Sequence, residues 1–165
     1  MEEFKTQCEA IRRGLATVVP YPLLSLFTWQ ELEVEVCGRP KMNVDMLEQM
    51  CTYEACSPTD SHIMLFWKMM RERLDDEERC QFLRFVWGRS RLPVRAIDFD
   101  RKFKISRMHA SDRAPDEYLP IAHTCFFSIE LPRYTCLDTM HQKILYAITH
   151  CVAIGKCIAM QINTS

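Results

Sequence analysis

The sequence predicts an α+β fold, because helical patterns fill the first half of the chain and strand patterns join a helix in the second. Up to residue 88, apolar residues recur at helical spacing behind polar capping residues. Beyond residue 100, two short runs have strand patterns, and a final amphipathic stretch returns to helical spacing.

The chain opens with a predicted helix over residues 3–15, whose apolar side chains fall on one face. A proline-containing break at 18–22 follows. Thr28 and Glu31 then form a capping-box pattern, which predicts a short helix that Gly38 ends.

The best candidate for a linker comes directly after this helix. Its residues are Gly38, Arg39, Pro40 and Lys41. They combine glycine with proline and have no aliphatic or aromatic side chain, a composition typical of loops. We therefore expect a hinge here, with residues 1–37 on one side and 42–154 on the other.

Three helices are predicted next. Their predicted capping residues are Asn43, then Asp60 or Ser61, then Asp75 paired with Glu78. Gly88 is expected to end the third helix. Large side chains at their helical positions predict a buried core and not a binding surface. These side chains are Trp67, Met69, Met70, Phe82 and Trp87.

Strand patterns follow at residues 103–105, which alternate, and at residues 125–131, which are mostly apolar. Thr135 is predicted to cap a final helix. The expected apolar face of this helix consists of Leu137, Met140, Ile144, Leu145, Ile148, Cys151 and Val152.

Composition narrows the classes of function. Of the 165 residues, 48% are hydrophobic and 26% are charged, which predicts a folded chain with a substantial core. The formal net charge of −1 argues against nucleic acid or an anionic membrane as the main partner. No apolar run approaches the ~20 residues of a membrane helix, and the charged start of the chain is unlike a signal peptide. We expect a cytoplasmic or nuclear protein.

Nine cysteines are scattered along the chain without a C-x-x-C pair or a secretion signal. Cys51, Cys56 and His62 have irregular spacing for a zinc site, and the sequence suggests no fourth ligand. We interpret the cysteines as free, mostly buried thiols that act as small apolar groups. Neither a metal nor another cofactor is expected.

Cys125 stands out chemically because of the residues around it. It follows a loop bounded by prolines and precedes a short apolar run, with His123 and Thr124 just before it. At such a junction the backbone can be fixed while the sulfur stays accessible, as a nucleophilic thiolate requires. Taken alone, however, the pattern fits a buried cysteine of a strand better than a nucleophile.

His123 has two interpretations. Its imidazole could polarise the Cys125 thiol or relay a proton, since imidazole titrates near neutral pH. That role requires an extended backbone, because residues two apart face the same side of a strand. We favour the alternative, in which His123 structures the loop.

Several motifs, in order along residues 4–154, resemble HECT-type ubiquitin ligases. They are PLLSLFTWQEL at 22–32, FLRFVWGRSRLP at 82–93, HTCF at 123–126, LPRY at 131–134 and KILYAI at 143–148. The amino-acid sequences around Trp87 and around Cys125 most resemble those of the very large HERC-type ligases.

The resemblance implies an architecture. Residues 42–154 would form the C-terminal catalytic lobe, with helices packed on a small sheet. Residues 1–37 would be a helical remnant of the N-terminal lobe, and 38–41 the hinge between the lobes. The tail 155–165 is atypical, because it lacks the acidic or aromatic residues found at the end of many HECT chains.

The resemblance also implies a reaction and its partners. Cys125 would accept ubiquitin from a conjugating enzyme as a thioester and then pass it to a lysine of a protein substrate. Thr124 would fix the active-site loop, His123 would support it, and backbone amides from Cys125 to Phe126 would steady the oxyanion. With this resemblance, we prefer the nucleophile to the buried strand cysteine.

Two departures from the family pattern lead to alternatives. The region that docks the conjugating enzyme is expected upstream of residue 1, and the tail puts the transfer to lysine in question. A lobe that binds ubiquitin but does not turn over would act as a scaffold or competitor. A third interpretation is a fragment whose apolar faces need a missing lobe.

Overall fold

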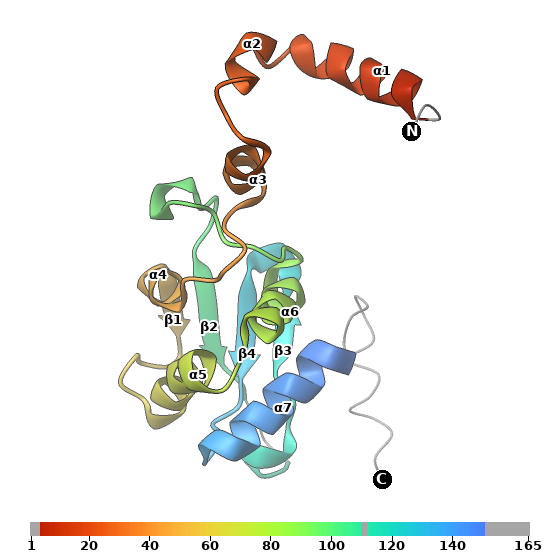
Figure 1. Ribbon diagram of the computed structural model, residues 1–165. Helices are drawn as coiled ribbons and strands as arrows, with labels where there is room; N and C mark the ends of the chain where they lie inside the picture. Colours follow the sequence, from red (N-terminus) through yellow and green to blue (C-terminus); the bar gives the residue numbers. More distant parts are fainter. Residues whose placement is uncertain (1–3, 110–111, 151–165) are drawn as a thin grey trace. The chain divides into compact units, whose positions relative to one another are not determined.

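The computed structural model describes residues 4–109 and 112–150 of the chain (Figure 1). It divides into two compact units, Met1–Gly38 and Arg39–Ser165. The boundary falls within the predicted linker 38–41, while the assignment of these units to two lobes and of the linker to a hinge stays a prediction. None of the described helices is long and apolar enough to cross a membrane.

Three helices are described in the first unit. They are α1 Lys5–Ala16, α2 Tyr21–Leu24 and α3 Trp29–Cys37. The predicted capping box at α3 is confirmed, because Thr28 Oγ1 accepts the Glu31 N–H at 3.2 Å and Glu31 Oε2 accepts the Thr28 N–H at 2.8 Å. Gly38 ends this helix with a φ of 85°, which a residue with a side chain would adopt only at a cost.

The second unit is built on a mixed sheet, which confirms the α+β class. Its described strands are β1 Cys51–Glu54, β2 Phe103–Arg107, β3 Ile121–His123 and β4 Ser128–Leu131, in the order β1-β2-β4-β3. Strand β2 pairs in parallel with β1 and β4, and β3 pairs antiparallel with β4. The sheet therefore places the β3–β4 connection near the start of β2.

Among the described residues of the second unit, four α-helices accompany this sheet. They are α4 Val44–Gln49, α5 Ser61–Glu72, α6 Asp76–Trp87 and α7 Leu137–His150. Local signals set their ends: Asn43 Oδ1 accepts the Met46 N–H at 2.9 Å, and Asp75 with Glu78 forms a second capping box. Gly88 ends α6 in the left-handed conformation, as predicted.

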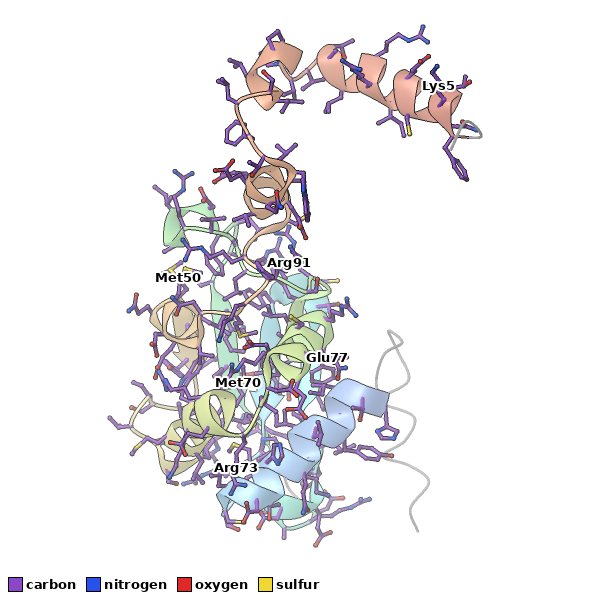
Figure 2. All side chains as sticks on the ribbon, viewed as in Figure 1. Lys5, Met50, Met70, Arg73, Glu77 and Arg91 are labelled. Carbon is purple, nitrogen blue, oxygen red and sulfur yellow. The ribbon has the colours of Figure 1, made fainter. Side chains whose placement is uncertain are left out.

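The core lies between the helices and the sheet. In Figure 1, α5, α6 and α7 lie in front of the strands, and Figure 2 shows their side chains filling the intervening space. Helix α7 packs against both α5 and α6. The predicted core residues Trp67, Met69, Met70, Phe82 and Trp87 are all buried, which confirms the core interpretation.

Two local expectations are wrong. Residues 125–131 do not form one strand, because 124–126 form a 3₁₀ turn and β4 begins only at Ser128. Thr135 does not cap the last helix: its N–H and hydroxyl bind Asp116, and Cys136 occupies the cap position instead. Cys151, Val152 and the tail 155–165 lie outside the described residues.

Candidate active site

Cys125 lies in a single 3₁₀ turn, Thr124–Phe126, that joins the antiparallel strands β3 and β4. The turn closes where the Phe127 N–H donates to the Thr124 carbonyl at 3.3 Å. The Phe127 carbonyl in turn accepts the Lys104 N–H at 3.0 Å, which ties the end of the turn to β2. At the other end, β3 finishes at His123, which pairs with Ser128 of β4, so the sheet holds both ends of the turn.

Phe127 anchors this turn. Its φ of 47° and ψ of 55° are left-handed, a conformation that costs a bulky residue about 1–3 kcal/mol. The side chain is fully buried, and its ring stacks on Trp87 at 4.2 Å and lies 5.0 Å from Phe103. Burying a phenylalanine is worth about 1.5–3 kcal/mol, and a ring pair adds about 0.5–1.5 kcal/mol, so packing offsets the backbone cost.

The thiol of Cys125 is free and exposed, and the neighbouring Phe126 is 70% exposed. An accessible sulfur on a fixed backbone is what nucleophilic catalysis requires. The structure thus places Cys125 on a turn and not on a strand, which removes the buried strand cysteine as an alternative.

Exposure alone does not single out Cys125. Among the described cysteines, Cys8, Cys37, Cys125 and Cys136 are exposed, and Cys51, Cys56 and Cys80 are half-buried. The interpretation of the thiols as mostly buried is therefore wrong, while all of these cysteines are free. What distinguishes Cys125 is its place on an anchored turn between two strands.

His123 contacts Glu130 across the β3–β4 pair. Its Nε2 lies 2.9 Å from Glu130 Oε1, and both side chains are partly exposed. The extended backbone that would turn His123 and Cys125 to one face is absent, because the 3₁₀ turn begins at Thr124. This geometry favours a loop-structuring role for His123. That role stays a prediction, as does the role of Thr124, whose carbonyl closes the turn.

Arg101 is a contact of the turn that the sequence did not reveal. Its guanidinium Nη1 donates a hydrogen bond to the carbonyl oxygen of Cys125. The only available signal was a basic residue two positions before the strand at 103–105. Its proximity to Cys125 depends on the parallel pairing of β2 with β4, which no local pattern predicts.

Two of the linker residues, Pro40 and Lys41, contact helix α6 of the second unit. Pro40 offers its carbonyl to the Cys80 thiol at 3.9 Å, and Lys41 Nζ lies 3.6 Å from Asp76. Gly38 belongs to the C-terminal cap of α3, where its N–H binds the Val34 carbonyl at 2.9 Å. The division between the two compact units falls between Gly38 and Arg39, and the hinge at 38–41 stays a prediction.

The weak zinc candidate has chemistry that disfavours a metal. Burial raises the pKa of Cys51 to about 12 and also raises the pKa of Cys56, whereas a metal ligand must be a thiolate. Burial lowers the pKa of His62, which favours the neutral imidazole that a metal would bind, so only the two thiols disfavour the site. Within residues 4–109 and 112–150, no group of three or more His, Cys, Asp or Glu side chains could hold a metal ion.

A sequence model of the family described as HECT-domain (ubiquitin-transferase) matches residues 1–155. The chain belongs to the HECT-domain family. The resemblance carried by the motifs around Trp87 and Cys125 is thereby confirmed, and so is the expected lobe-like α+β fold.

Curated proteins named as E3 ubiquitin-protein ligases are similar to the chain. The chain is 44% identical over 154 residues to human E3 ubiquitin-protein ligase HERC2, an alignment that covers 93% of the chain. It is 33% identical over 150 residues (89% of the chain) to mouse E3 ubiquitin-protein ligase HUWE1. It is 36% identical over 151 residues (87% of the chain) to the probable E3 ubiquitin-protein ligase TOM1 of Eremothecium gossypii. The chain spans about 3–4% of the length of these relatives.

Proposed function

We propose that this chain is the catalytic-lobe portion of a HECT-type ubiquitin ligase and carries ubiquitin as a thioester on Cys125. The observation that supports this most directly is the exposed Cys125 thiol on an anchored turn, in a chain of this family. The proposed partners are ubiquitin, a ubiquitin-conjugating enzyme and a protein substrate. The proposed place of action is the cytoplasm or the nucleus.

In the first step, the thiolate of Cys125 attacks the carbonyl carbon of the thioester between ubiquitin and the conjugating enzyme. A new carbon–sulfur bond forms, and the intermediate collapses by breaking the bond to the conjugating enzyme's sulfur. That sulfur leaves as a thiolate and takes up the proton that Cys125 lost. One thioester replaces another, so the catalyst mainly has to position the two sulfurs and the carbonyl.

The oxyanion of that intermediate needs hydrogen-bond donors. In a 3₁₀ turn each N–H binds the carbonyl three residues earlier, so the N–H groups at the start have no partner inside the turn. In this turn these are the N–H groups of Thr124 and Cys125. Of the backbone amides from Cys125 to Phe126, we therefore assign the donor role to that of Cys125.

In the second step, the neutral amine of a substrate lysine attacks the carbonyl carbon of the Cys125 thioester and forms an amide with ubiquitin. The carbon–sulfur bond to Cys125 breaks, and the released thiolate takes up the proton that the amine loses. His123 and Thr124 are proposed to support this chemistry by holding the β3–β4 connection, through Glu130 and through the closing bond to Phe127.

The test is an assay with ubiquitin-charged conjugating enzyme, run on non-reducing gels with the full chain. The wild-type chain and Cys136→Ser should form a reductant-sensitive ubiquitin adduct, whereas Cys125→Ser should form no thioester. Cys136 is the matched control because it is also exposed. A folded wild-type chain that binds ubiquitin but forms no adduct would instead support the binding-module alternative.

A further inference from the structure

A charged side chain holds the turn that carries Cys125. The guanidinium of Arg101 donates from Nη1 to the Cys125 carbonyl oxygen. Arg101 lies two residues before β2, and the first pairs of the β2–β4 ladder are Lys104 with Ser128 and Ile105 with Ile129. The start of β2 therefore runs beside the end of the turn, which brings Arg101 to it.

The acceptor is a carbonyl that the turn itself does not use. The last carbonyls of a short helix have no partner within it. Cys125 is the middle residue of the turn Thr124–Phe126, so its carbonyl is one of these. A hydrogen bond from a guanidinium is charge-assisted and directional, which makes Arg101 well suited to fix this peptide group.

Arg101 also belongs to a group of side chains that reaches Phe127. Asp100 Oδ2 lies 3.9 Å from Arg101 Nε and 3.4 Å from Arg89 Nη2. The Arg89 guanidinium lies 4.5 Å from the centre of the Trp87 ring, on which Phe127 stacks. Arg101, Asp100, Arg89 and Trp87 thus form one chain of contacts. It links the carbonyl of Cys125 at one end to Phe127 at the other.

These polar contacts are partly exposed, so each contributes little to global stability. Their effect should instead appear in geometry, because they restrain the peptide group of the residue that bears the reactive sulfur. A small displacement of a reacting group can reduce a rate far more than it reduces stability.

We propose that Arg101 is a positioning residue for Cys125, which fixes the turn so that the sulfur and the Cys125 N–H face the incoming thioester. This role rests on the proposed function. Arg101 contacts neither reacting partner and acts through the backbone of Cys125.

The test compares Arg101→Ala and Arg101→Lys with Lys102→Ala, in which the neighbouring exposed cation is removed. The donor is the thioester of the ubiquitin C-terminus with a small thiol, which requires no conjugating enzyme. The rate of adduct formation at Cys125 is measured against donor concentration. Arg101→Ala should lower the maximal rate about tenfold with little change in the half-saturating concentration. Arg101→Lys should recover most of the rate, and Lys102→Ala should match wild type.

A second measurement does not depend on ligase activity. Hydrogen exchange of the Phe127 amide, measured by NMR, reports closure of the turn. It should accelerate in Arg101→Ala but not in Lys102→Ala, while the melting temperatures stay alike.

The outcomes separate the two claims. Equal adduct rates for Arg101→Ala and Lys102→Ala would overturn the positioning role, whatever the exchange rates. If the wild-type chain forms no adduct, the proposed function fails and the positioning role in catalysis falls with it. Exchange at Phe127 would still decide whether Arg101 holds the turn, because that contact exists without ubiquitin.

Discussion

At the scale of single residues, the site depends on one exposed and one buried side chain that are close neighbours in the sequence. Cys125 is exposed on its turn, and Phe127 is fully buried beneath it. Phe126, between them, points its ring to solvent. This alternation lets the same short segment both display a thiol and anchor it in the core.

The neighbouring phenylalanines give a matched pair of variants. Phe127→Ala should lower the free energy of unfolding by about 3–5 kcal/mol, because it removes a buried ring from the core. Phe126→Ala should change it by less than about 0.5 kcal/mol, because its ring is mainly in solvent. Urea unfolding followed by fluorescence measures both. Similar losses for the two variants would show that Phe127 is not the anchor.

His62 is a second residue-scale feature. Its side chain is 1% exposed, and neither ring nitrogen has a hydrogen-bond partner in the described part of the chain. Burial lowers the pKa of His62 below its ordinary 6.5; Asp60 opposes this shift, and Arg133 and Arg107 add to it. The folded chain therefore prefers the neutral imidazole.

The sign of the resulting pH dependence follows from linkage. Below about pH 6.5 the unfolded chain binds the His62 proton before the folded chain does, so stability is lost as pH falls. One proton contributes at most about 1.4 kcal/mol per pH unit. The free energy of unfolding of His62→Leu should therefore fall less steeply than that of wild type between about pH 7 and 5. Parallel curves would contradict this.

At the scale of elements, helix starts were predictable because their signals are local. Thr28 with Glu31 and Asp75 with Glu78 form both halves of a capping box within four residues of sequence. The start of the last helix was predicted less accurately, because Cys136 occupies the N-cap position where Thr135 was expected. Cys136 Sγ accepts the Thr139 N–H at 3.4 Å and contacts the Thr139 hydroxyl at 3.0 Å.

Strands β1 and β3 were missed for a different reason. They have four and three residues, and they exist through pairing with strands that are distant or reversed in direction. The 3₁₀ turn at Cys125 could not be predicted from the sequence either, because no glycine or asparagine marks the left-handed position at Phe127. Its stability comes from contacts with Trp87 and Phe103, which only the tertiary structure brings together.

The cap at Cys136 can be tested by two substitutions. Cys136→Ser keeps an acceptor for the Thr139 N–H and should leave the melting temperature nearly unchanged. Cys136→Ala removes the acceptor and should lower it by a few degrees. Hydrogen bonds from Thr139 also lower the pKa of Cys136, so its alkylation should begin at a lower pH than for an ordinary thiol. Equal melting temperatures for the two variants would rule out the cap.

At the scale of the whole molecule, the core belongs to the second unit. All the buried hydrophobic side chains of the described residues lie between Met42 and Ile148. The helix α1 of the first unit has none, and Phe4, Ile11 and Leu15 are exposed. Stability of the described chain should therefore come mainly from residues after Gly38.

A chain beginning at Arg39 should accordingly fold on its own. We expect one cooperative urea transition with a midpoint close to that of the full chain, because none of the deleted residues whose burial is described contributes a buried hydrophobic side chain. Circular dichroism and fluorescence should report the same transition. Loss of cooperativity would show that residues 1–38 complete the fold.

The most direct test of the central claim is to identify the residue that carries ubiquitin. The adduct would be trapped at low pH without reductant, digested, and mapped by mass spectrometry. The account predicts ubiquitin on Cys125 and no thioester on Cys125→Ser, with the same adduct retained by Cys136→Ser. An undiminished thioester on folded Cys125→Ser, or one mapped to Cys136, would contradict it.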